Sequence, residues 1–317
     1  MSEPTTTFRV GAREGGRRLD RFLHQRIPGL SRARLQRAIR ERVSISWDAR
    51  VRPSTPVRPG GEVHIGYTPL VETLLAIELR VLARGEGWLA VDKPPGIPVH
   101  PVNRVRENSL IRILRRQEGH ESLRLVHRLD RETSGALLVA EDAPTSSLLS
   151  QAFMKGTVHK EYLALVSGVP DRDRGSIDLA VGRAVSSAVY TKQEAGHGRT
   201  ARTEWRVERS LGDRALLRLF PRTGRRHQLR VHMAAVGHPV LGDILYGRPE
   251  RHYLDLVGGA EDVRIREGGP LRQLLHCARL VFPDPAGVGE VEVSSPLPVD
   301  MAEQLGPRAC RPATNRI

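Results

Sequence analysis

Apolar segments of strand length recur from about residue 78 to residue 300, and they constrain the fold more than any other feature of the chain. Only two helical patterns are expected among them, at 143–156 and 225–236. Because strands mostly follow strands, the pattern predicts an α+β domain with a largely antiparallel, mixed sheet rather than a doubly wound parallel one. The expected strands are 88–93, 123–126, 136–141, 160–168, 200–209, 214–222, 274–282 and 289–295.

A smaller basic unit is expected at 17–67. It contains two short amphipathic helices, 19–27 and 32–42, followed by strands at 43–47 and 62–65. Arg32, Arg34 and Arg37 fall on the polar faces of the second helix, which suits contacts with backbone phosphates, although a plain solvated helix face gives the same pattern. The domain organisation that we expect is a flexible arm at 1–16, this helix-helix-hairpin module at 17–67, a linker at 68–77, the main domain at 78–300 and a loose tail at 301–317.

The charge balance favours a polyanionic partner. Lysine and arginine number 50 against 36 acidic residues, a net charge of +14, which predicts attraction to nucleic acid. The chain has no apolar run long enough to span a membrane and no signal-peptide pattern at its N-terminus. It has only two cysteines, which argues against a disulfide framework. We therefore expect a cytoplasmic protein that binds RNA or DNA and no membrane.

The segment HRLDRETSG (127–135) is the first candidate for chemistry. It places Asp130 between Arg128 and Arg131, in a loop flanked by two apolar strands. A carboxylate there can act as a nucleophile, a general base or a metal ligand, or it can form a structural ion pair.

The expected helix 225–236 offers a partner for this carboxylate. Arg225 shares an inward stripe with Leu229 and Met233, and an inward arginine needs an anion, so we expect an ion pair between Arg225 and Asp130. Arg226 and Arg230 fall on a neighbouring stripe, where they can meet phosphate.

Several other chemistries lack their motifs. There is no phosphate-binding GxxxxGK[ST] loop, no dinucleotide-binding GxGxxG, no HExxH zinc helix and no zinc-deaminase pattern. The remaining prediction is a site built on one aspartate, without a metal, a nucleotide cofactor or any other cofactor.

At this point the chain resembles the RluA-type family of pseudouridine synthases. HRLDRETSG is similar to the family signature, and further motifs follow the family in order: VDKPPGIPVHP (91–101), HKEYLALVSG (159–168), TGRRHQLRVH (223–232), LGDILYG (241–247) and LLHCARLVFP (274–283). The segment 17–66 resembles the αL-type RNA-binding module first known from a ribosomal protein.

The resemblance implies an RNA-modifying isomerase that flips a uridine out of structured RNA and rejoins its uracil through ring carbon 5. Asp130 is then the nucleophile, attacking either the ribose glycosidic carbon or the uracil ring, and Tyr162 stacks on the base and assists proton removal. Arg225 holds Asp130, and Arg128 fills the gap left by the flipped uridine. Further RNA contacts are expected from Lys93, Arg131, Arg226, Arg230, Arg32, Arg34 and Arg37.

Ribosomal RNA is expected ahead of transfer RNA as the substrate, and the enzyme is expected to be a monomer. Two other functions fit parts of the pattern. One is a non-enzymatic RNA-binding or ribosome-assembly protein, which would be expected to lack Asp130, Tyr162 or Arg225. The other is a nucleoside hydrolase, which would need a second carboxylate, with Glu132 as the nearest candidate.

Overall fold

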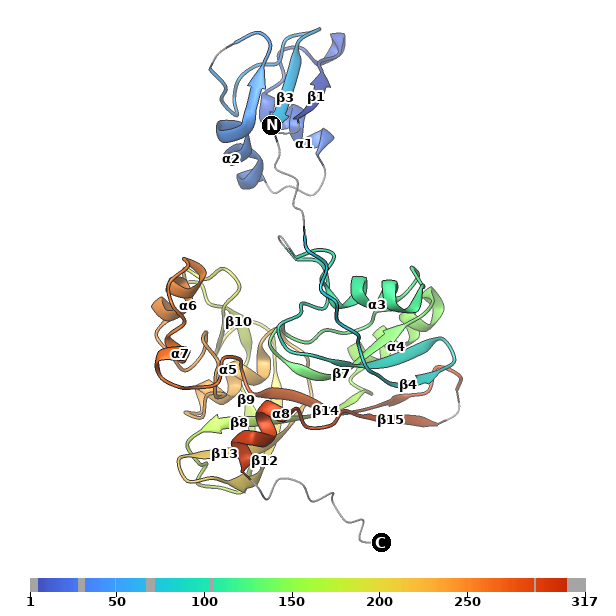
Figure 1. Cartoon of the computed structure of the whole chain (residues 1–317), viewed down its shortest axis with the longest axis vertical. Coiled ribbons are helices and arrows are strands. Elements are labelled where there is room, and N and C mark those ends of the chain that lie inside the picture. The colour runs from blue at the N-terminus through green and yellow to red at the C-terminus, as the bar shows by residue number, and fades with distance from the viewer. Residues whose placement is uncertain are drawn as a thin grey trace. The chain divides into compact units, whose positions relative to one another are not determined.

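The chain divides into two units, Met1–Val71 and Glu72–Ile317, and the division falls within the expected linker (Figure 1). The computed structural model describes residues 5–27, 32–48, 50–66, 72–102, 105–287 and 289–306. Each unit has its own hydrophobic core, so each is described by itself.

The N-terminal unit packs two helices against a small antiparallel sheet of order β1-β3-β2. Leu19, Phe22 and Leu23 on the first helix and Leu35 and Ile39 on the second are fully buried, as their spacing of three and four residues predicts. The elements are β1 (Thr5–Arg9), the 3-10 helix η1 (Ala12–Glu14), α1 (Leu19–Arg26), α2 (Arg32–Arg42), β2 (Val43–Ile45) and β3 (Glu62–Gly66).

The prediction of a flexible arm at 1–16 is wrong for residues 5–16. The β1 strand pairs with β3 along its whole length, from Thr5 opposite Gly66 to Arg9 opposite Glu62. Val10, directly after the strand, is 2% exposed and belongs to the core of the unit. The segment's polar sequence hid this role, because an edge strand buries few of its side chains. Residues 1–4 lie outside the described residues.

The second unit is built on one large sheet. Its strand order is β4-β5-β7-β14-β8-β13-β12-β9, with β15 also paired to β14 and β6 to β7. All of the pairings are antiparallel except the one between β7 and β14, which confirms the expected α+β fold with a largely antiparallel, mixed sheet. The strands are β4 (Val81–Gly85), β5 (Trp88–Lys93), β6 (Arg124–Leu125), β7 (Ser134–Ala140), β8 (His159–Ser167), β9 (Arg174–Asp178), β12 (Arg202–Ser210), β13 (Arg214–Pro221), β14 (Leu275–Pro283) and β15 (Glu290–Ser294).

Helices cover different parts of this sheet. Figure 1 shows α3 and α4 beside β7 and β4, and α5, α6 and α7 gathered near β10. The expected helix at 143–156 is confirmed as α4, whereas the sequence pattern did not predict α3, α6, α7 or α8. The remaining elements are α3 (Leu110–Glu118), α4 (Ala143–Lys155), α5 (Gln228–Ala235), α6 (Glu250–Val257), α7 (Val263–Arg266), α8 (Val299–Leu305), β10 (Val181–Arg183) and β11 (Gln193–Ala195).

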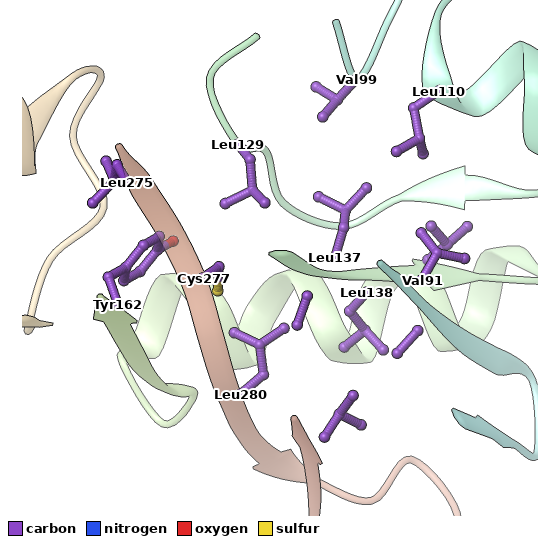
Figure 2. Close-up of a cluster of buried hydrophobic side chains, with 14 of the residues drawn as sticks. Val91, Val99, Leu110, Leu129, Leu137, Leu138, Tyr162, Leu275, Cys277 and Leu280 are labelled. Carbon is purple, nitrogen blue, oxygen red and sulfur yellow. The ribbon is translucent and has the colours of Figure 1, made fainter. Parts of the chain in front are cut away.

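The parallel contact between β7 and β14 sets the position of the HRLDRETSG loop. Ser134 lies opposite His276 and Gly135 opposite Cys277. Gly135 has φ 111°, and a Cβ placed on it would lie 2.2 Å from the carbonyl oxygen of Cys277, so only glycine fits this crossing. Leu129, at the other end of the loop, points into the main hydrophobic cluster (Figure 2). The loop is therefore fixed at both ends, with Asp130 between them.

A buried lysine braces the same loop. The Lys93 side chain is 0% exposed, and its Nζ donates to the carbonyl oxygens of Pro94, Arg131 and Thr133, each at 2.8 Å. The prediction that Lys93 contacts RNA is therefore wrong, because its three donors are used inside the protein. A lysine in a turn after a strand is compatible with a phosphate contact or with a structural role, and the backbone carbonyls that enclose Lys93 leave no pattern in the sequence.

Two boundary predictions also need correction. Residues 72–77 are part of the second unit, since the Glu72 carboxylate accepts hydrogen bonds from the backbone N–H groups of Arg106, Glu107 and Asn108. The loose tail expected at 301–317 is instead helical at 301–305, where Met301 and Leu305 are buried. Residues 68–71 and 307–317 lie outside the described residues.

Replacing Lys93 with Met should destabilise the second unit by about 3 kcal/mol, because three buried carbonyl oxygens lose their donor. Chemical denaturation of the full chain measures this change. The control is Lys155→Met at the exposed end of α4, which should change the free energy of unfolding by less than about 0.5 kcal/mol. Equal stability of the two variants would contradict a stabilising role for the hydrogen bonds of Lys93.

The lysine should also leave a pH signature. Burial lowers the pKa of Lys93 to about 7 from its ordinary value of 10.5. Between these values the folded state binds fewer protons than the unfolded state, so stability rises with pH. The wild type should therefore gain stability relative to Lys93→Met as the pH is raised from about 7 to about 9, measured by denaturation at each pH. A constant difference between the two proteins would show that Lys93 does not titrate in this range.

Candidate active site

A pocket of about 150 Å³ opens where the Asp130 loop, β8, β14 and the start of α5 meet. Asp130, Tyr162 and Leu275 line one part of it, and the segment before α5 lines the rest. Residues 100 positions apart in the chain are thus in contact, as the ion pair between Asp130 and Arg230 shows. The lining is Arg128, Leu129, Asp130, Thr133, Lys160, Tyr162, Pro221, Thr223, Gly224, Arg225, Arg226, His227, Gln228, Leu229, Arg230 and Leu275.

Arg230 holds the Asp130 carboxylate. Its Nη1 donates to Asp130 Oδ2 at 3.0 Å, while Nε and Nη2 bind Asp243 at 2.6 and 2.8 Å. Burial opposes the charge on Arg230, but Asp243 and Asp130 raise its pKa above the ordinary value. One buried arginine therefore joins two carboxylates, of which Asp243 is fully buried and Asp130 partly open to the pocket.

Asp130 remains ionised in this setting. Burial alone would raise the pKa of its carboxyl group, but the neighbouring His227, Arg230 and Arg128 side chains together lower it below its ordinary value. Oδ2 accepts a hydrogen bond from Arg230, whereas Oδ1 has no hydrogen bond within the described residues and lies 3.9 Å from His227 Nε2. A charged carboxylate with one oxygen facing a pocket is suited to attack an electrophilic carbon.

The expected ion pair between Arg225 and Asp130 is wrong. The helix begins at Gln228 rather than at 225, so Arg225 lies in the preceding turn and its Nε donates to the carbonyl of Thr200 at 3.0 Å. The expectation that Arg230 meets phosphate is also wrong. Arg230 is 7% exposed, and its guanidinium binds Asp130 and Asp243. Arg225 nevertheless lines the pocket.

Gln228 explains where the helix starts. Its side-chain oxygen accepts hydrogen bonds from the Thr223 hydroxyl and the Arg225 N–H, and its Nε2 donates to the Arg202 carbonyl and the Thr203 hydroxyl. The side chain therefore ties the turn before α5 to β12, and an unbroken helical pattern through 225–236 is the wrong model for this segment.

Tyr162 lies on β8 directly opposite Cys277 of β14. Figure 2 shows the two side chains beside one another at the edge of the core. Burial, together with the contact with Cys277, raises the pKa of the Tyr162 hydroxyl well above its ordinary value. The hydroxyl is therefore protonated at neutral pH, which suits a stacking ring better than a proton acceptor.

The other arginines expected to bind RNA differ in position. Arg128 and Arg226 are exposed at the pocket rim and have no hydrogen bond or ion pair with any residue that the structure describes. Arg131 is also exposed, with its Nε bound to the Gly96 carbonyl. Arg37 is exposed on α2 and pairs with Glu41. The side chains of Arg32 and Arg34 lie outside the described side chains.

The sequence interpretation missed three residues of the site. Asp243 and Tyr246 belong to LGDILYG, which was recognised as a motif but given no role. Lys160, two residues before Tyr162 on β8, also lines the pocket and has no acidic partner among the residues with described side chains. The signal for Asp243 was that a buried arginine needs carboxylate partners, and Asp243 is the one acidic residue of LGDILYG.

The described residues contain no group of three His, Cys, Asp or Glu side chains placed to hold a metal ion. Within the same part of the chain, no helix is long and apolar enough to cross a membrane.

Comparison with known proteins identifies the family. Residues 87–235 match the RNA pseudouridylate synthase family model. The chain is 36% identical to an uncharacterized RNA pseudouridine synthase of Chloroflexus aurantiacus, over 90% of this chain and 87% of that protein. It is 34% identical to the ribosomal large subunit pseudouridine synthase D of Nitrosomonas europaea, over 96% and 88%.

A solved structure agrees. Human RNA pseudouridylate synthase domain containing 1 superposes with a TM-score of 0.57 at 31% identity, covering 71% of this chain and 86% of that one. The resemblance inferred from HRLDRETSG and the motifs around it is confirmed. The chain belongs to the RluA-type family of RNA pseudouridine synthases, which are isomerases.

Proposed function

We propose that this enzyme converts uridine to pseudouridine in structured RNA with Asp130 as its nucleophile, and that ribosomal RNA is the substrate ahead of transfer RNA. The observation that carries the proposal is the ionised Asp130 carboxylate, which lines the pocket and is held through Oδ2 by Arg230. The choice of ribosomal RNA rests on relatives named as ribosomal large subunit enzymes.

The reaction is an isomerisation and needs no atom from outside. The Asp130 carboxylate forms a bond to the ribose glycosidic carbon or to the uracil ring, and the bond from nitrogen 1 to the ribose breaks. Carbon 5 then bonds to the ribose, and the bond to Asp130 breaks again, which frees the carboxylate. The carbon 5 proton is lost and a proton is gained at nitrogen 1. No cofactor is consumed in this scheme. Tyr162 stacks on the uracil and keeps water from the bond being broken.

Base flipping gives the exposed arginines a role. A uridine within a helix must leave the stack to reach a pocket of this size, at a cost of a few kcal/mol. Arg128 stands beside Asp130 in the chain and is exposed, so its planar guanidinium can occupy the vacated place in the RNA. Arg131, Arg225 and Arg226 contact neighbouring phosphates. We expect the enzyme to act as a monomer in the cytoplasm, where its RNA is found.

The rival function of nucleoside hydrolysis has less support. It needs a second carboxylate to serve as acid or base. Glu132 does not line the pocket and its side chain pairs with Arg131 at 3.7 Å. Asp243 is fully buried, and its oxygens accept from Arg230 and from the backbone N–H groups of Leu245 and Tyr246. Neither carboxylate is free to act on a bound nucleoside.

Asp130→Asn should abolish pseudouridine formation, because the amide is not a nucleophile, while RNA affinity changes little. Tritium release from uracil-labelled ribosomal RNA measures activity, and filter binding measures affinity. The control is Asp213→Asn, whose side chain is 97% exposed, and it should behave as wild type. Full activity of the Asp130 variant would refute the mechanism.

Replacing Arg32, Arg34 and Arg37 with Gln in the full chain should weaken RNA binding and lower the salt dependence of the binding constant. Each lost phosphate contact removes about 0.7 to 0.9 from the slope of log K against log salt, so a fall of about 2 is expected. The control removes the same charge from Arg172, Arg174 and Arg251, which are exposed on the second unit. Equal slopes for both variants would show that α2 adds only net charge.

A further inference from the structure

His227 has an unusual backbone conformation next to the nucleophile. With φ 54°, it is the only non-glycine residue at positive φ in the described part of the chain, and it directly precedes α5. This conformation is sparsely populated and is held by the surrounding structure. It brings the imidazole Nε2 to 3.9 Å from Asp130 Oδ1 and Nδ1 to 2.8 Å from the Tyr246 hydroxyl.

The hydrogen bonds of Tyr246 fix which nitrogen of His227 carries the proton. The backbone N–H of Gln193 donates to the Tyr246 oxygen at 2.9 Å. The phenol is buried, and within the described residues the one other polar atom that bonds to its hydroxyl is His227 Nδ1. The hydroxyl proton is therefore directed to Nδ1, which must be the acceptor, and the proton of the neutral imidazole resides on Nε2.

We propose that Gln193, Tyr246 and His227 form a relay that keeps His227 neutral with its Nε2–H aimed at Asp130 Oδ1, and that Tyr246 is a positioning residue of the reaction. The inference rests on the proposed role of Asp130 as nucleophile. His227 then supplies a hydrogen-bond donor to the oxygen that Arg230 leaves open. Catalytic hydrogen bonds are often long in a free enzyme and shorten when the substrate binds. We expect the 3.9 Å distance from His227 Nε2 to Asp130 Oδ1 to shorten in this way.

A neutral donor suits this position better than a charged one. The groups that face His227 are Asp130 and Asp243, Arg230 and Arg226, and the Tyr246 ring, which stands edge-on at 5.7 Å between centroids. Burial, aided by the two arginines, lowers the pKa of His227 to about 4 against the opposing carboxylates. A second cation at Asp130 would hold the carboxylate more tightly and weaken its attack.

Tyr246 organises both partners of the carboxylate. Its ring lies 4.9 Å from the Arg230 guanidinium carbon, while its hydroxyl binds His227. The ring packs in a small cluster with Val181, Val231 and Leu245. Removing the hydroxyl alone should thus disturb His227 and leave the cation–π contact with Arg230 in place.

The tautomer of His227 is measured by ¹⁵N–¹H correlation spectra of the full protein, with the His227 signals identified by their loss in His227→Gln. At pH 7 the wild type should show a protonated Nε2 and a bare Nδ1. Tyr246→Phe should give a mixture of tautomers and a pKa closer to 6.5, because neutral His227 loses its donor. The control is Tyr253→Phe, whose ring packs against the same cluster and whose hydroxyl has no hydrogen bond to any described residue; this variant should change neither.

Activity gives the second readout. Tyr246→Phe should lower kcat about tenfold with KM for RNA unchanged, the factor expected for one net hydrogen bond. As the pH is lowered, the variant should also lose activity at a higher pH than the wild type does, because its His227 becomes protonated at a higher pH. His227→Gln, which keeps a neutral donor, should retain more activity than His227→Leu.

A wild-type spectrum with the proton on Nδ1, or Tyr246→Phe with an unchanged tautomer and pH profile, would overturn the relay. Failure of the nucleophile proposal would look different. Asp130→Asn would then remain active, while the tautomer of His227 in the wild type would still be as stated.

Discussion

The active site depends on one buried arginine shared by two carboxylates. Arg230 places three of its N–H groups on Asp130 and Asp243, and removing it would leave both carboxylates without their shared cation, which typically costs about 3–5 kcal/mol for a broken buried ion pair. Asp243 uses its remaining capacity on the backbone of Leu245 and Tyr246, so it fixes the guanidinium. With its guanidinium fixed in this way, Arg230 binds only Oδ2 of Asp130, and Oδ1 has no hydrogen bond within the described residues.

The same site is rigid because its loop is bound on several sides. Lys93 ties the loop to the turn after β5, and the Gln273 side chain donates to the Thr133 hydroxyl at 2.7 Å. Gly135 lets β7 approach β14 closely enough for Asp130 to stand near Tyr162. These contacts use backbone groups or buried side chains, so the loop is fixed before any RNA binds. Preorganisation of this kind lowers the reorganisation needed during the reaction.

Much of this arrangement could be predicted from the sequence, and the failures have physical causes. The strands of the main sheet other than β4 and β9, together with α4, follow from periodicity, and the motif HRLDRETSG singles out Asp130, which lines the pocket. The partner of Asp130, Arg230, was not predicted. The helical pattern was extended through 225–227, where His227 at positive φ precedes the first residue of the helix. Spacing assigns faces only inside a helix. The burial of Lys93 was equally hidden, since carbonyl acceptors leave no trace in side-chain patterns.

Exposure divides the cations around the pocket into two groups. Arg230 and Lys93 are buried, and each donates hydrogen bonds to oxygen atoms of the protein. Neither side chain is therefore available to bind a phosphate of the RNA. Arg128 and Arg226 are exposed beside the same pocket and have no carboxylate bound to them in the described structure. In the sequence all four are basic residues, and only their burial separates the two groups. A long-range field can therefore draw RNA to the pocket through the exposed arginines, while the charge state of Asp130 is set by Arg230, which salt and RNA reach poorly.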